Sequence, residues 1–133
     1  MPPIVWQLMR FGAVGLVNTA IGLLAIYAAM YFWSIEPGIA NAIGYAIGLA
    51  ISFALNRVWT FSDARSIQAV LPRYLTVAAV CYLLNLGVVL IGARYFGIDP
   101  YLVQFFGISI YTTAMFIGCK WLVFRPVARL GLQ

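Results

Sequence analysis

Four long apolar runs, separated by short polar stretches, account for nearly the whole chain. None of the runs contains Asp, Glu, Lys, Arg or His, and each holds about the 20 residues that a helix needs to cross a hydrocarbon core of about 30 Å. The runs are Phe11–Trp33, Pro37–Asn56, Tyr74–Ala93 and Pro100–Cys119. The pattern predicts an all-α integral membrane protein with four transmembrane helices, forming a single membrane domain over residues 1–133.

The second half of the chain repeats the first half at a shift of 63 positions. Matching pairs at this shift, reached without a gap, include Arg10/Arg73, Pro37/Pro100, Gly44/Gly107, Arg57/Lys120 and Phe61/Phe124. Because each half holds two predicted spans, both halves enter the membrane with the same orientation. We therefore expect two parallel two-helix repeats, at about residues 8–62 and 71–125, related by a pseudo-two-fold axis along the membrane normal.

Composition and charge agree with a membrane protein and predict its orientation. The chain is 65% apolar and 8% charged, whereas a soluble domain carries about 25% charged residues. Seven of the eight basic residues lie at the termini or in the middle loop, namely Arg10, Arg57, Arg65, Arg73, Lys120, Arg125 and Arg129. The positive-inside rule then predicts that both termini are cytoplasmic. The net charge of +5 is explained by this topology, so we expect no nucleic-acid partner.

The residues that most catalytic and metal sites require are missing from the sequence. There is no His, and no Asp or Glu lies within a span. Cys81 and Cys119 lie in apolar runs at positions unrelated by the repeat, which favours packing over a metal or disulfide pair. We expect no enzyme activity, no metal and no cofactor. The missing carboxylate also argues against a small four-helix multidrug exporter, which depends on one.

Several short features predict local structure. Glu36-Pro37 and Asp99-Pro100 are typical of helix starts. A stripe of small residues at every fourth position predicts close helix packing, and it permits a homodimer. The stripe consists of Ala40, Gly44, Gly48, Ser52 and Asn56. Residues 62–66 of the middle loop predict the start of a short helix lying on the membrane, with Ile67, Val70 and Leu71 facing lipid.

Cations at the predicted cytoplasmic ends of the helices and amides within the spans leave two interpretations open. Arg10 and Arg73 precede the predicted helix starts, where a cation opposes the helix dipole, and Arg57 and Lys120 follow helix ends. The cations either mark topology alone or attract a phosphate. The amides of the spans are Asn18, Asn41, Asn56 and Asn85. They either bond between helices or provide a polar path for a hydroxyl-rich head group.

Three segments carry a resemblance to a known family. These are Arg10–Thr19, Asn41–Tyr45 and Phe53–Phe61, the last of which contains Asn-Arg-Val-Trp-Thr-Phe. In this order they resemble the GtrA-like family of four-helix bacterial membrane proteins. The resemblance implies a role in cell-surface polysaccharide synthesis, in which a polyprenyl-phosphate-linked sugar crosses from the cytoplasmic to the outer leaflet of the inner membrane. It also implies a partner membrane glycosyltransferase that makes the lipid-linked sugar.

The motif positions, the internal repeat and the amides of the spans together predict a head-group site. Its residues are Arg10, Asn18, Asn41, Asn56, Arg57, Trp59, Arg73, Asn85 and Lys120. The four cations of this set would capture the phosphate, and Asn18 and Asn56 would accompany the head group. The second repeat is degenerate, since Cys119 replaces Asn56 and Leu122 replaces Trp59. The alternative function is a non-transporting scaffold that anchors the glycosyltransferase.

Overall fold

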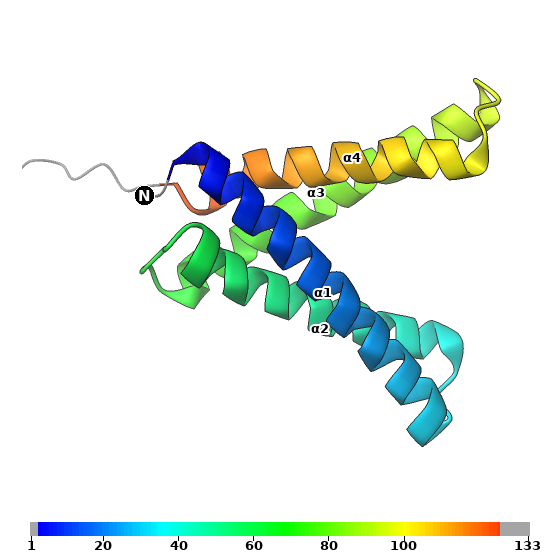
Figure 1. Ribbon diagram of the computed structural model, residues 1–133, viewed down its shortest axis with the longest axis horizontal. Coiled ribbons are helices and arrows are strands. Elements are labelled where there is room, and N and C mark those ends of the chain that lie inside the picture. The colour runs from blue at the N-terminus through cyan, green and yellow to red at the C-terminus, as the bar shows by residue number, and fades with distance from the viewer. Residues whose placement is uncertain (1–2, 126–133) are drawn as a thin grey trace, which may run out of the picture. The chain divides into compact units, whose positions relative to one another are not determined.

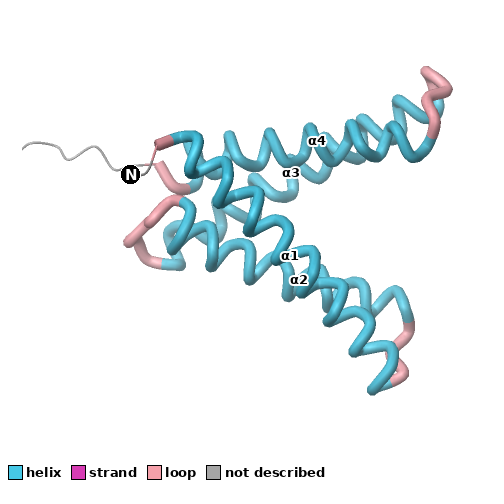
Figure 2. The backbone as a smooth tube through the Cα atoms, viewed as in Figure 1, coloured by secondary structure: helices cyan, strands magenta, loops and turns pink. Residues whose placement is uncertain are grey.

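The computed structural model describes residues 3–125, and this part of the chain is helical, without a strand (Figures 1 and 2). The helices are α1 (Ile4–Trp33), α2 (Pro37–Leu55), α3 (Ile67–Arg94) and α4 (Pro100–Gly118). α2 continues into the π-helical turn η1 (Asn56–Thr60), and α4 continues into η2 (Cys119–Val123). Within the described residues, four helical segments are long and apolar enough to cross a membrane. The predicted all-α membrane fold is confirmed.

The chain divides into two compact units, Met1–Ala64 and Arg65–Gln133. Each unit is a pair of helices that run side by side and end in a π-helical turn, α1 with α2 and η1, and α3 with α4 and η2 (Figure 1). The start of every element in the second unit lies 63 positions after its counterpart in the first, as at Ile4/Ile67 and Asn56/Cys119. That the two units form one membrane domain stays a prediction.

Both helix pairs turn in the same way at the end opposite the π-helical turns. Ser34 follows α1 with a left-handed φ of 50°, and Gly97 has a φ of 58° at the equivalent position in the other unit. The amide of Ile35 then donates to Ala29 O at 3.3 Å, as the amide of Ile98 donates to Gly92 O at 3.1 Å. Each bond joins an amide to the carbonyl six positions earlier, one position more than in the Schellman motif, and the left-handed residue directly before that amide permits the closure.

The carboxylates before the two proline-led helices cap those helices. Glu36 Oε2 accepts a hydrogen bond of 3.2 Å from the amide of Ile39. Asp99 Oδ1 accepts one of 3.2 Å from the amide of Leu102. The first amides of a helix have no partner inside the helix, so a side-chain oxygen that accepts from them stabilises the helix start. The predicted capping role of both acidic residues is confirmed.

Glycines allow the two helices of each unit to approach closely. Gly44 and Gly48 are buried, and a Cβ on Gly44 would lie 2.8 Å from the carbonyl oxygen of Gly22 on α1. Gly107, the repeat mate of Gly44, faces Asn85 on α3 in the same tight manner. The small-residue stripe of α2 therefore packs on α1 within its own unit, as a helix contact of this kind predicts. A homodimer stays a prediction.

The predicted starts of the first and third helices are wrong. α1 begins at Ile4 and α3 at Ile67, so Arg10 and Arg73 are each the seventh residue of a helix. A charged residue at the edge of an apolar run predicts the boundary of a span, but a long basic side chain can remain in a helix and extend to the interface. These arginines consequently do not precede a helix start, and the predicted opposition of their charge to the helix dipole is wrong.

The short surface helix predicted in the middle loop is also wrong. Residues 61–66 are not helical, and Ile67 begins α3, which continues through Pro72 to Arg94. Val70 is fully buried where we expected it to face lipid. Pro72 lies in the second turn of α3, so its lack of an amide hydrogen removes one bond without ending the helix. Arg129, counted above toward topology, lies outside the described residues.

Candidate functional site at the π-turn ends

Each unit ends its second helix in a five-residue π-helical turn at the same repeat position. The amide of Phe61 donates to Asn56 O at 2.9 Å, and the amide of Phe124 donates to Cys119 O at 2.7 Å. Wider turns of this kind are rare and occur frequently at functional sites. We call the end of each unit that carries η1 or η2 its π-turn end. Arg10, Asn56, Arg57 and Trp59 of the predicted site lie at this end of the first unit.

An aromatic pair fastens the first helix of each unit to the residue after its π-helical turn. The rings of Phe11 and Phe61 meet edge to face with centroids 6.5 Å apart. Their repeat mates, Tyr74 and Phe124, lie 6.4 Å apart. Pairs at this separation contribute about 0.5–1.5 kcal/mol beyond the area they bury. In both units, therefore, a ring contact holds the first helix against the π-turn end.

Arg10 closes the π-turn end of the first unit. Its Nη1 donates to the carbonyl oxygen of Trp59 at 2.9 Å, and its guanidinium carbon lies 5.4 Å from the centroid of the Trp59 ring. A cation near a helix C-terminus satisfies carbonyls that have no partner within the helix. Trp59 itself stays 45% exposed. Two predicted site residues are thus brought into direct contact, in an arrangement that stabilises η1.

Arg65 makes the corresponding carbonyl contact in the second unit. Its Nη2 donates to the carbonyl oxygen of Val123 at 2.7 Å. Arg73, the repeat mate of Arg10, has Leu122 in place of Trp59. It is exposed, and within residues 3–125 it makes no hydrogen bond, ion pair or ring contact. The sequence alone did not predict a site role for Arg65, because its acceptor is a backbone carbonyl, which is present whatever the residue type.

Asn56 is the middle member of a series of side-chain hydrogen bonds along its own helix. Its Nδ2 donates to Ser52 Oγ at 3.2 Å, and its Oδ1 accepts from Thr60 Oγ1 at 2.9 Å. The Asn56 side chain is 1% exposed. Ser52 and Thr60 were not predicted as partners, although their spacing of four residues on either side of Asn56 was a usable signal. The chain of contacts gives Asn56 a structural role in η1.

The second unit replaces this polar chain with apolar side chains at the same three positions. Met115, Cys119 and Val123 occupy the places of Ser52, Asn56 and Thr60. All three are buried, with Cys119 and Val123 fully so. The same packing position therefore accepts either a connected polar set or an apolar set. This agrees with the rule that a buried network should be fully satisfied or absent.

Asn18 and Asn85 lie deeper in their helices, each against a glycine of the facing helix. A Cβ on Gly48 would clash with Asn18 Oδ1, and one on Gly107 would clash with Asn85 Oδ1. Both oxygens are buried and accept no hydrogen bond within the described residues. At 1.5 Å per residue, Asn18 lies about 12 Å along the helix axis from Arg10. Each unit thus holds one unsatisfied amide oxygen in its apolar part.

The remaining predicted residues lie apart or are already engaged. Asn41 is exposed at the start of α2, about 22 Å along the axis from Asn56. Arg57 and Lys120 are half-buried, and each interacts with other residues of the protein. The structure therefore places Arg10, Trp59 and Asn56 around one turn and does not bring Asn41 to that turn.

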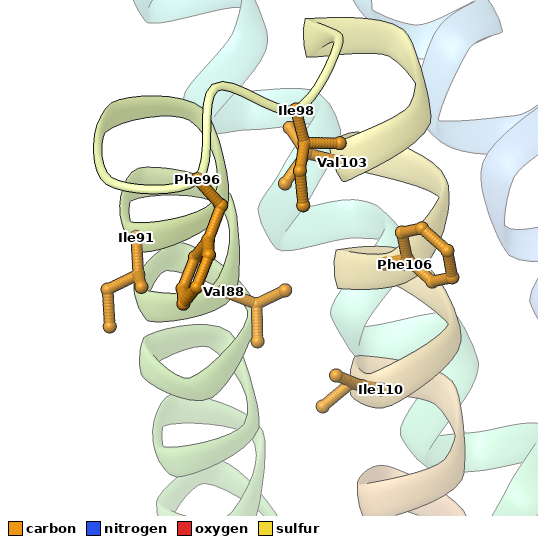
Figure 3. Close-up of a pocket in the computed structure, with 8 residues that line it drawn as sticks. Val88, Ile91, Phe96, Ile98, Val103, Phe106 and Ile110 are labelled. Atoms are coloured by element: carbon orange, nitrogen blue, oxygen red, sulfur yellow. The ribbon is translucent and has the colours of Figure 1, made fainter.

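An apolar pocket opens in the second unit near the turn between α3 and α4 (Figure 3). Its volume is about 360 Å³. The lining side chains are all apolar and come from α3, the turn and α4: Val88, Ile91, Gly92, Phe96, Ile98, Val103, Phe106 and Ile110. With no polar side chain in its wall, the pocket suits hydrocarbon and offers a sugar no side-chain hydrogen bond.

Comparison with known proteins identifies the family of the chain. The family model described as GtrA/DPMS, transmembrane domain, matches residues 10–124. Neither the curated proteins nor the solved structures contain a match to the chain. The matched segment begins at Arg10 and ends at Phe124, so it includes all four helices and both π-turn ends. The chain belongs to the GtrA/DPMS transmembrane-domain family.

Proposed function

We propose that the protein moves a polyprenyl-phosphate-linked sugar from the cytoplasmic to the outer leaflet of the bacterial inner membrane. Family membership supports this, because it links the chain to the processing of polyprenyl-phosphate sugars. A membrane glycosyltransferase would supply the lipid-linked sugar on the cytoplasmic side, where the proposed topology places both π-turn ends. The proposal assigns no covalent step to this chain.

The substrate has two parts, an apolar polyprenyl tail and a polar head group of phosphate and sugar, and each makes a different demand on the protein. A polyprenyl tail can stay in lipid while its phosphate and sugar cross, beside helices whose outer faces expose large apolar side chains such as Leu16 and Leu83. The barrier is the desolvation of the hydroxyls and of the phosphate charge. With the inside negative, outward movement of one negative charge gains about 2.3 kcal/mol per 100 mV. A charge-driven flippase of this kind needs no proton-carrying carboxylate within the spans.

The observation that carries the proposal is the buried, unsatisfied oxygen of Asn18 and of Asn85. An amide oxygen without a partner in a membrane helix costs free energy and gives the fold nothing in return. A sugar hydroxyl would donate to such an oxygen where the two helices of a unit part beside it to admit the head group. Each unit would then offer one acceptor to the head group within the apolar part of its path.

Translocation by Asn→Leu variants tests this role. Asn18→Leu and Asn85→Leu should each slow translocation of a radiolabelled polyprenyl-phosphate-hexose in proteoliposomes about fivefold to tenfold, the equivalent of one hydrogen bond. Their thermal stability in detergent should stay equal to wild type or rise, because an unsatisfied polar atom is removed. Gln104→Leu, a change at an exposed position of α4, is the matched control and should transport at the wild-type rate.

The opposite pattern would contradict the proposal. If Asn18→Leu and Asn85→Leu lower thermal stability while translocation by the folded protein is unchanged, the two amides serve the fold alone. If wild-type protein moves no lipid-linked sugar although it is folded and oriented, the flippase proposal fails as a whole.

The apolar wall of the α3–α4 pocket favours a second candidate function. Since this pocket provides no polar contact for a sugar, the chain would instead serve as a non-transporting anchor for a polyprenyl-phosphate glycosyltransferase. The anchor predicts that the chain copurifies with that enzyme and raises its activity, while proteoliposomes with the chain alone stay inactive. Translocation by the chain alone decides for the flippase.

A further inference from the structure

Arg10 and Arg73 occupy the same repeat position and the same turn of their helices, but their surroundings differ. Arg10 donates to Trp59 O and lies over the Trp59 ring. Arg73 is exposed and, within the described residues, bonds to nothing. The second unit therefore has an arginine, Arg73, at the position of Arg10, but Arg73 lacks the contact that Arg10 makes with Trp59.

The structural task of Arg10 is done by another residue in the second unit. Arg65 donates to Val123 O at 2.7 Å and so caps η2, as Arg10 caps η1 through Trp59 O. Leu122 at the Trp59 position also removes the ring over which a guanidinium could lie. Arg73 consequently has neither a carbonyl to cap nor a ring to cover.

We infer that Arg73 is the guanidinium that binds the phosphate of the lipid substrate, whereas Arg10 serves to hold η1. The inference rests on the proposed function and narrows its phosphate contact to one residue. A guanidinium presents a planar fork of donors that matches two phosphate oxygens at once. The uncommitted fork of Arg73 is free to make that contact, while one Nη of Arg10 is already bound to a carbonyl.

The charges of the second unit leave Arg73 without a competing carboxylate. The acidic residue of this unit is Asp99, which follows the far end of α3 and caps α4. From Arg73 to Arg94, where α3 ends, the axis rises about 30 Å. At that distance an exposed carboxylate is screened at physiological salt. Among the described residues of its own unit, Arg73 thus has no nearby side-chain carboxylate to neutralise it before a ligand arrives.

Binding of a polyprenyl monophosphate to purified protein in nanodiscs, measured by native mass spectrometry, tests the inference. Arg73→Gln should lower the affinity at least about tenfold and leave the melting temperature unchanged. Arg10→Gln should lower the melting temperature, and the folded protein should lose less affinity than Arg73→Gln loses. Arg125→Gln is the matched control, because Arg125 is also exposed and also makes no contact within the described residues. Its affinity should equal that of wild type.

Three results would overturn the inference. The first is retained binding in Arg73→Gln with a greater loss in folded Arg10→Gln. The second is an equal loss in Arg73→Gln and Arg125→Gln, which would mean that positive charge acts without regard to position. The third is an equal loss of phosphatidylglycerol binding in Arg73→Gln, which would make Arg73 an anchor for any anionic lipid. Wild-type protein that binds no polyprenyl phosphate at all would refute the proposed function itself, together with this inference.

Discussion

The contact of Arg10 with Trp59 shows how one side chain can join the two helices of a unit at its π-turn end. The guanidinium bonds to a backbone carbonyl and covers an aromatic ring, so two interactions are made by one group. An exposed cation–π contact contributes about 0.5–1 kcal/mol, and more where water is excluded. The carbonyl bond depends only on the backbone of residue 59, whereas the ring contact depends on the tryptophan.

Replacement of Trp59 by leucine, the residue at the equivalent position of the second unit, separates the two interactions. We expect Trp59→Leu to lower the free energy of unfolding by about 0.5–1 kcal/mol, because the cation–π contact is lost while the carbonyl bond remains. Reversible unfolding in mixed micelles measures the change. Trp121→Leu is the control, since Trp121 is exposed and has no ring contact within residues 3–125. Equal destabilisation of both variants would mean that Trp59 acts only as an interfacial anchor.

At the scale of the element, η1 and η2 are the same kind of turn, but the buried side chains at each turn differ: they are polar at η1 and apolar at η2. Asn56 bonds to Ser52 and Thr60, whereas Cys119 lies between buried Met115 and Val123. A π-helical turn at both positions therefore does not depend on the polar set. The side chains stabilise a turn that the surrounding packing already permits.

A double-mutant cycle on Asn56 and Thr60 measures how strongly the polar set is coupled. Asn56→Cys removes the acceptor of the buried Thr60 hydroxyl, and Thr60→Val removes a donor to buried Asn56 Oδ1. Each should lower the free energy of unfolding by about 1–3 kcal/mol. The double variant, which carries the residues of the second unit, should be more stable than the sum of the single effects predicts, by about 0.5–3 kcal/mol. Additive effects would show that the 2.9 Å hydrogen bond from Thr60 Oγ1 to Asn56 Oδ1 contributes nothing to stability.

At the scale of the whole molecule, the 63-residue shift relates two units with the same elements at the same positions. The αL residues Ser34 and Gly97 and the starts of α2 and α4 all obey it. Each unit contains one pair of membrane-length helices, so each returns the chain to the side of the membrane on which it began. Both π-turn ends are then expected on one side, which the distribution of basic residues predicts to be the cytoplasm.

Labelling of single added cysteines tests this topology. A membrane-impermeant maleimide should label Ser34→Cys and Tyr95→Cys in intact spheroplasts, and it should label Ser66→Cys only after lysis. All three positions are exposed, and the native Cys81 and Cys119 are buried, so wild type provides the unlabelled control. Labelling of Ser66→Cys in intact spheroplasts would place the π-turn ends outside and would refute the proposed direction of transport.

A structural feature could be predicted from the sequence where it requires particular residue types. Lipid requires apolar side chains over a whole span, so the four spans and their repeat were visible. The starts of α1 and α3 were missed because a single arginine interrupts the apolar pattern without ending the helix. The capping contacts of Arg10 and Arg65 were invisible because their acceptors are backbone carbonyls, which every residue carries. The nine-residue head-group site stays a prediction, and Asn41 lies about 22 Å from the turn around which Arg10 and Trp59 meet.

The polar and apolar interiors of η1 and η2 also constrain how the two halves could diverge from a common ancestor. To convert one interior into the other, one of Ser52, Asn56 and Thr60 must change first, and each order passes through a form with a polar side-chain atom that has lost its partner. We expect such an intermediate to be less stable than both end states. A half with one interior would then not change easily to the interior of the other by single substitutions, which would preserve the asymmetry of the two units.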